Sequence, residues 1–182
     1  MAVTDPSVGV PAWEAFDMGN SGVEQGNPQF NPVIEVTVEG LCEPVEPGGV
    51  GAYAFEIASG SETLESGSGI LEPGPSSSSL TCRYIALVRA LTWLMSRGYQ
   101  FRPVRVLSCS TLFVNRLSGR WDTHEGNASY RRYLDAVNMA GRFTSLDYRN
   151  VDHSMCTDLY ELCCRRYEEY CLAHLRPVAY KF

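Results

Sequence analysis

Cysteine and histidine side chains recur at helical spacing near the carboxyl end of the chain. They are Cys156, Cys163, Cys164, Cys171 and His174. Thiolate and imidazole groups are the ligands that zinc and other soft metal ions prefer, so one possible role of the set is a metal cluster. The same spacing suits small apolar residues on the buried face of a helix, and this is the role that we expect. The odd number of cysteines, seven without any C-x-x-C pair, also argues against a disulfide framework or a zinc ribbon.

Charge is distributed unevenly along the chain. Residues 1–82 carry twelve acids and no base, whereas residues 83–182 carry fifteen bases and nine acids, and the net charge is −6. Fourteen of the bases are arginines, whose guanidinium groups suit phosphate forks and stacking on nucleic-acid bases. An arginine bias can equally reflect genome composition, so charge alone leaves nucleic-acid binding open.

Length and composition indicate one globular domain with an extra segment. The chain has 182 residues, of which 45% are hydrophobic and 20% charged, and no window approaches the length of a membrane span. Residues 1–31 are rich in Gly, Pro, Asn and acids, which predicts a flexible acidic arm without the basic and apolar regions of a secretory signal. We therefore expect a soluble, intracellular protein, cytoplasmic or nuclear, with its domain at residues 32–176 and a tail at 177–182.

The elements that must position the polar residues begin with strands. A β-branched run at residues 33–38 predicts the first strand. A Pro- and Gly-rich turn at 45–49 separates it from an alternating segment at 51–57, and a third strand is expected at 60–71. Three strands joined by short turns predict an antiparallel meander.

Helical periodicity dominates the second half. Tyr84, Leu87, Leu91 and Leu94 recur at the spacing of an amphipathic helix over residues 81–97, with a Ser or Thr81 cap before it and Gly98 after it. Beyond it we predict a strand at 104–107, helices at 111–117 and 127–142, a strand at 143–148 and a long helix at 155–175. The predicted order is β-β-β-α-β-α-α-β-α.

Four motifs along this order resemble those of type 1 ribonuclease H. Glu39-Gly40 followed by Pro47-Gly-Gly-Val-Gly-Ala52 is similar to the family's first hairpin, and residues 83–94 (RYIALVRALTWL) are similar to its first helix. Ser108-Cys-Ser110, the segment LFVNRL at 112–117 and Gly119-x-Trp121 match a further succession, and residues 152–159 fall where the family has an Asn followed by Ala-Asp-x-Leu. The resemblance covers about residues 33–175. It implies an α/β fold with a five-stranded mixed sheet, three antiparallel strands and then two parallel ones, flanked by helices.

The resemblance also implies a site. Members of this family hydrolyse RNA strands with two magnesium ions held by four carboxylates, because hard cations demand oxygen ligands. Position by position, the motifs place Glu39, Arg83, Cys109 and Asp158 where the family has Asp, Glu, Asp and Asp. These four groups sum to roughly −1 at neutral pH in place of about −4, so no metal and no cofactor is expected there.

Arg83 is the most severe of these replacements. Its guanidinium cannot lose its proton, and we expect it to pair with Glu39 and Asp158, which turns a metal site into an internal salt bridge. His153 lies where some family members place a mobile histidine that assists product release. A solvent-exposed loop histidine is the other interpretation of this residue.

The leading functional hypothesis is a catalytically inactive ribonuclease H-like domain that binds RNA or an RNA/DNA hybrid, or serves as a scaffold in a ribonucleoprotein. Arginines of the second half would contact the nucleic-acid backbone: Arg116, Arg120, Arg131, Arg132 and Arg149. The alternative is an active metal-dependent ribonuclease H that hydrolyses the RNA strand of hybrids with one magnesium ion on Glu39 and Asp158, helped by His153.

Protein partners remain open at this stage. The acidic amino-terminal half could face a basic partner, whereas no membrane partner is expected. Aromatic and apolar residues on the last helix are either core or a surface for a second copy of the chain, so homo-oligomerisation stays undecided: Tyr160, Leu162, Tyr167, Tyr170 and Leu172.

Overall fold

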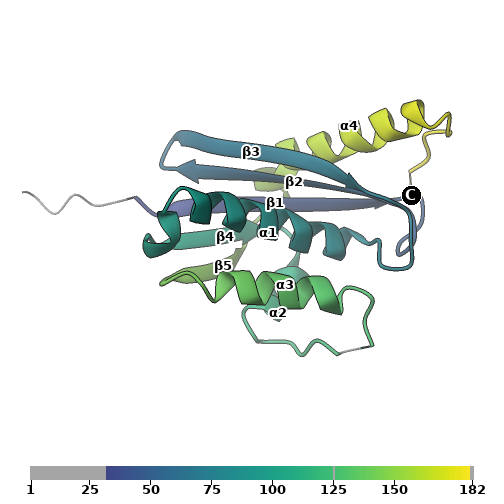
Figure 1. The fold of residues 1–182 in the computed structure, drawn as a ribbon. Helices are drawn as coiled ribbons and strands as arrows, with labels where there is room; N and C mark the ends of the chain where they lie inside the picture. Colours follow the sequence, from purple (N-terminus) through teal and green to yellow (C-terminus); the bar gives the residue numbers. More distant parts are fainter. Residues whose placement is uncertain (1–31, 125, 181–182) are drawn as a thin grey trace, which may run out of the picture. The chain divides into compact units, whose positions relative to one another are not determined.

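A computed structural model describes residues 32–124 and 126–180 of the chain. Its centre is a five-stranded sheet in the order β3-β2-β1-β4-β5 (Figure 1). β2 lies antiparallel to β1 and β3, whereas β4 lies parallel to β1 and β5 parallel to β4. The predicted α/β class, strand arrangement and order of elements are confirmed. The strands are β1 (Ile34–Glu43), β2 (Val50–Ser59), β3 (Glu62–Leu71), β4 (Val104–Ser108) and β5 (Leu146–Asn150).

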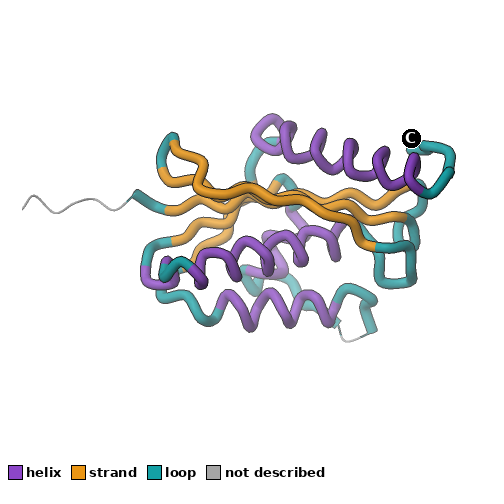
Figure 2. Tube along the Cα trace, turned by 45° about the horizontal axis from the view of Figure 1, so that its top comes forward, coloured by secondary structure: helices purple, strands orange, loops and turns teal. Residues whose placement is uncertain are grey.

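Helices cover both faces of the sheet. One face carries α4 alone, and the other helices lie on the opposite face, as the edge-on view in Figure 2 shows. Within the described chain, no helix is both long enough and apolar enough to cross a membrane. The helices are α1 (Ser79–Ser96), α2 (Thr111–Leu117), α3 (Tyr130–Ala140) and α4 (Thr157–Ala173), with short 3-10 turns at Tyr99–Phe101 and His153–Cys156.

Alternation along β1 divides the core in two. Val36 and Val38 point to the α1 side, where they pack with the apolar stripe of that helix. Leu41 points to the α4 side and packs with Cys163 and Tyr167. By the same period of two, Glu39 stands on the α4 side of β1, beside Leu41.

Half of the α4 residues named from the sequence are core, whereas Tyr160 and Leu172 are exposed. Cys163, Cys171, Tyr167 and Tyr170 are buried against the sheet, as expected for a helix face of small and aromatic residues. The last described residues fold back on this helix, since the Tyr167 hydroxyl donates to the Ala179 carbonyl oxygen over 2.6 Å. The acidic arm predicted for residues 1–31 lies outside the described residues.

The first strand is longer than its β-branched run. The prediction ended it at residue 38, but β1 continues to Glu43 because β2 pairs with it from Ile34↔Ser59 to Glu43↔Val50. β4 pairs with it only as far as Thr37↔Leu107. The second half of β1 therefore extends beyond β4.

The helix and strand predicted for 127–142 and 143–148 are both displaced. The Asn127 side chain accepts hydrogen bonds from the Ser129 backbone N–H and hydroxyl at 3.0 and 2.9 Å, so a turn precedes α3. Phe143 is buried, and its N–H donates to Ala140 O over 3.0 Å, so this aromatic residue closes the helix instead of starting β5.

Helices α1 and α4 also begin at residues other than those predicted. Ser78 caps α1 by accepting a hydrogen bond from the Thr81 N–H at 3.0 Å, so the helix starts two residues early. Gly98, at φ 77°, follows its end as expected. Cys156 still belongs to a 3-10 turn, so α4 begins at Thr157 and not at residue 155.

Gly40 determines how closely α1 approaches β1. A Cβ atom at this position would lie 2.4 Å from Ser79 O and 2.9 Å from Arg83 N. Both are backbone atoms, so no side-chain movement could relieve the overlap. The absence of a side chain at Gly40 thus brings the first turns of α1, with Arg83, against β1.

We expect Gly40→Ala to lower the free energy of unfolding by about 1–3 kcal/mol, because the helix must move away from the strand. Urea denaturation followed by circular dichroism measures this loss. Gly74→Ala is the matched control, since a Cβ at Gly74 would meet no atom within 4 Å, and it should cost no more than about 0.5 kcal/mol. Equal losses in the two variants would contradict the role of Gly40.

Candidate functional site

A pocket of about 350 Å³ opens where β1 extends past the end of β4. This is the carboxyl edge of the parallel strands, the usual position of ligand sites in open α/β sheets. Its walls come from β1, α1, the residue after β4, the 3-10 turn at His153–Cys156 and the start of α4. The lining residues are Glu39, Arg83, Cys109, His153, Cys156, Thr157 and Tyr160.

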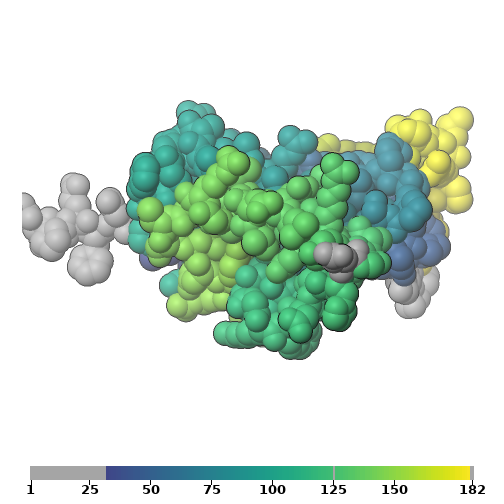
Figure 3. Space-filling model, turned by 60° about the horizontal axis from the view of Figure 1, so that its bottom comes forward, coloured from purple at the N-terminus to yellow at the C-terminus, as the bar shows by residue number. Residues whose placement is uncertain are grey.

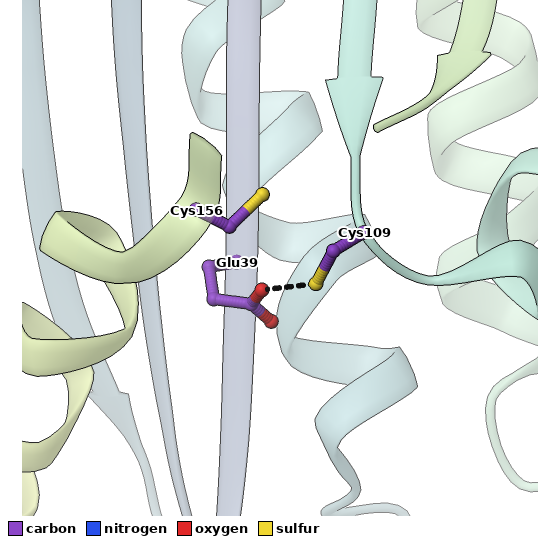
Figure 4. Close-up of side chains that lie close together, drawn as sticks. All are labelled: Glu39, Cys109 and Cys156. Atoms are coloured by element: carbon purple, nitrogen blue, oxygen red, sulfur yellow. Dashed lines mark hydrogen bonds between the residues drawn. The ribbon is translucent and has the colours of Figure 1, made fainter. Parts of the chain in front are cut away.

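The centre of the pocket is the carboxylate of Glu39, which is only 1% exposed. Its Oε1 atom accepts hydrogen bonds from the Gly40 N–H, at 2.8 Å, and from Arg83. Its Oε2 atom accepts one from the Cys109 thiol at 2.9 Å, drawn as a dashed line in Figure 4. A buried carboxylate requires such donors, and these three satisfy both of its oxygen atoms.

Arg83 forms an ion pair with Glu39, and its side chain is 14% exposed. The pairing expected from the sequence is therefore present for Glu39. Among the ion pairs of the described residues, none joins Arg83 to Asp158. Because the guanidinium stays protonated, Glu39 and Arg83 together carry no net charge.

Asp158 does not reach the pocket. Its side chain is exposed, and the pocket is lined by its neighbour Thr157 instead. Counting the Ala-Asp-x-Leu pattern back from the buried Leu159 places its acidic position on Thr157 and leaves Asp158 at the variable position. Successive residues of a helix point about 100° apart, so Thr157 can line the pocket while Asp158, one position further, does not. We therefore reassign the fourth position of the site to Thr157.

Two further side chains complete the wall. His153 lines the pocket, although it is itself exposed. Cys156, which the sequence placed with the α4 cysteines, is buried beside Cys109 and Glu39. One sulfur from each cysteine and one Glu39 oxygen lie within 4.8 Å of one another. The sequence could have indicated this position for Cys156, because Cys156 immediately precedes Thr157 in the segment that aligns with the Ala-Asp-x-Leu pattern.

Both thiols of the site hold their protons at neutral pH. Burial raises the pKa of Cys109 to about 12, and the hydrogen bond to Glu39 and the charge of Glu39 act in the same direction. Burial also raises the pKa of Cys156, assisted by the charge of Glu39. The pocket thus combines one carboxylate, one guanidinium and two neutral thiols.

Comparison with known proteins gave matches among solved structures. Family models and curated proteins gave none. RNase H1 from the halophilic archaeon Halobacterium salinarum aligns over 75% of this chain and 98% of its own, with 18% identity and a TM-score of 0.64. The amino-terminal RNase H domain of a Mycobacterium tuberculosis protein aligns over 78% and 99%, with 19% identity and a TM-score of 0.65. LC11-RNase H1, isolated from compost, was crystallised in complex with an RNA/DNA hybrid; it aligns over 75% and 98%, with 18% identity and a TM-score of 0.65.

The chain has a ribonuclease H-like fold. The matches cover nearly the whole of each neighbour, so the strand order and the flanking helices are shared with type 1 RNase H1 structures. At this identity the likeness concerns the fold and not the chemistry of the pocket.

The arginines proposed from the sequence come from several segments of the ribonuclease H-like fold. They belong to α2, α3, β5 and the segment after α2, and the green segments around α2 and α3 lie together on the face seen in Figure 3. Arg132 and Arg149 pair with neighbouring acids, Asp135 and Asp147, at 3.3 and 3.2 Å.

The remaining three arginines differ in exposure. Arg116 has two guanidinium nitrogens that are buried and make no hydrogen bond within the described part of the chain. Arg120 and Arg131 are exposed, and neither takes part in an ion pair between described residues. Arg120 and Arg131 are therefore the most available cations of the set.

Replacing Arg83 by Met should cost about 3–5 kcal/mol of unfolding free energy, because it leaves the Glu39 carboxylate buried without its cation. Adding Glu39→Gln to this variant should recover part of the loss, which a double-mutant cycle in urea measures. Arg132→Met, which breaks an exposed pair, is the control and should cost at most about 1 kcal/mol. If both arginine variants cost the same, the buried pair contributes no more to stability than an exposed one.

Alkaline pH should destabilise the protein. Unfolded thiols ionise near their ordinary pKa of 9.0, whereas folded Cys109 keeps its proton until about pH 12, so rising pH favours the unfolded state over this interval. The free energy of unfolding, measured in buffer with a chelator, should fall from about pH 9 towards about pH 12. Cys109→Ser should make the decline shallower; a decline as steep as in the wild type would refute this assignment.

Proposed function

We propose that this protein is a catalytically inactive ribonuclease H-like domain that binds RNA or an RNA/DNA hybrid. The observation that carries the proposal is the ion pair between Arg83 and Glu39. Phosphodiester hydrolysis with two metal ions needs a cluster of oxygen ligands that face the ions. In this pocket the one lining carboxylate already accepts hydrogen bonds from a guanidinium, a thiol and a backbone N–H.

A magnesium pair does not fit the residues of the pocket. Glu39 and Arg83 sum to zero charge, and the two thiols are neutral, so nothing offsets the charge of two dications. Thiols are poor magnesium ligands, and Thr157 offers only a neutral hydroxyl in the fourth position. We therefore propose that the domain works without magnesium.

Binding to a nucleic-acid duplex needs no metal. Proteins recognise A-form helices through their shape and through phosphate contacts from basic side chains. Arg120 and Arg131 offer such contacts from the α2–α3 side of the fold. A neighbour with the same fold, LC11-RNase H1, was crystallised with an RNA/DNA hybrid, which supports this class of ligand.

The active-nuclease alternative loses its second ligand. It required one metal ion on Glu39 and Asp158, and Asp158 is exposed and outside the pocket lining.

The leading hypothesis also had a version in which the domain is a protein scaffold in a ribonucleoprotein. RNA binding at low salt distinguishes the two versions, because a protein scaffold need not bind RNA.

Incubation of the full chain with a labelled RNA/DNA hybrid and Mg²⁺ or Mn²⁺ should give no cleavage, whereas an active type 1 ribonuclease H cleaves the same sample. Cleavage that disappears in Glu39→Gln would overturn the proposal of inactivity. Cleavage that persists in this variant identifies a contaminating nuclease. The sample is then purified until the variant no longer cleaves the hybrid.

Binding to the same hybrid, followed by fluorescence anisotropy, should weaken with salt. Arg120→Ser with Arg131→Ser should reduce the affinity and lower the slope of log K against log salt by about 0.9 for each phosphate that is no longer neutralised. Arg165→Ser with Arg176→Ser is the control, since it removes two exposed cations from α4 and the segment after it. Equal effects would exclude the α2–α3 side as the binding surface, and no binding at low salt would favour the protein scaffold.

A further inference from the structure

We propose that Glu39, Cys109 and Cys156 together bind a single thiophilic divalent cation of the zinc class. The three side chains come from β1, from the residue after β4 and from the turn before α4 (Figure 4). Their donor atoms lie within 4.8 Å of one another. A tetrahedral zinc ion holds its ligand atoms about 3–4 Å apart, so small side-chain rotations suffice to close the site.

The ligand types select the metal. Two sulfur donors and one carboxylate oxygen suit zinc or cobalt, whereas magnesium demands oxygen donors in an octahedral arrangement. Cys109 already points its sulfur at Glu39 Oε2 over 2.9 Å, so the ion would replace the thiol proton between these two atoms. Three protein ligands leave the fourth tetrahedral position on the pocket side, where His153 lines the wall.

The charges balance for one dication. With both cysteines as thiolates, the ligands carry about −3, which one dication and Arg83 together offset. Arg83 contacts Glu39 Oε1, so it can keep that contact while Oε2 turns to the metal. The guanidinium that opposes a magnesium pair thus becomes an outer partner that orients the carboxylate of a mixed sulfur and oxygen site.

Binding exchanges protons for the ion and involves no change of oxidation state. Two S–H bonds break, two sulfur–metal bonds form, and both protons pass to the solvent, so the apparent affinity rises with pH. The inference uses the pocket of the proposed function, but it requires neither RNA binding nor the absence of nuclease activity.

Cobalt(II) titration of the full chain, kept reduced with a phosphine, tests the site. We expect the absorption bands of a tetrahedral cobalt–thiolate complex to saturate at one ion per chain, and zinc to abolish them by displacement. Cys109→Ser with Cys156→Ser should remove the bands and weaken zinc binding at least about 100-fold. Cys164→Ser is the matched control, since this half-buried α4 cysteine lies outside the cluster, and it should leave the spectrum unchanged.

Circular dichroism of the double variant verifies that it folds, and Glu39→Gln provides a second measurement. Glu39→Gln should keep both thiolate bands and weaken zinc binding about 10-fold. The proposal is overturned by a wild-type protein that gives no thiolate bands, by bands that persist in the double variant, or by magnesium that displaces cobalt as well as zinc does. A failed hybrid-binding experiment leaves this spectroscopic result unaffected. The proposal of nucleic-acid binding and the proposal of a metal site are therefore tested independently.

Discussion

A carboxylate without contact to water is stable only where donors or cations surround it, and Glu39 meets this condition through Arg83, Cys109 and the Gly40 N–H. The packing of the neighbouring elements brings these donors within reach of Glu39. Arg83 can reach Glu39 because α1 packs directly on β1, and α1 packs there because Gly40 has no side chain. The strand, the helix and the charge pair are therefore interdependent.

The position of this pair follows from the sheet. β1 lies in the middle of the five strands and is buried on both faces, with one core under α1 and another under α4. The strand β1 extends beyond the end of its pairing with β4. Glu39 and Cys109 therefore lie close together past the last residues that these two strands pair, where α4 also begins. The ribonuclease H-like fold thus gathers residues from four elements at one edge of the sheet.

The same geometry supports different chemistry once the charges change. A cluster of acids at this edge would attract hard dications, but a guanidinium at residue 83 neutralises the carboxylate, and the cysteines beside it add sulfur donors that suit softer metal ions. Function in this fold depends on the side chains of the site and not on the sheet that carries them. This is why the likeness to RNase H1 structures identifies the fold, while the proposed functions depend on Arg83, Cys109 and Cys156.

The sequence by itself determined the order of elements and the ionic character of residue 83. Hydrophobic periodicity reports which residues face a core, and an arginine is charged in every environment, so both inferences need no coordinates. Only the tertiary structure decided which residues near the start of α4 face the pocket: Cys156 and Thr157 do, and Asp158 does not. The physical reason is the helical rotation of about 100° per residue, which turns a one-residue error of alignment into a change of environment. Strand pairing likewise set the true length of β1, because its last residues are held by β2 and not by their own β propensity.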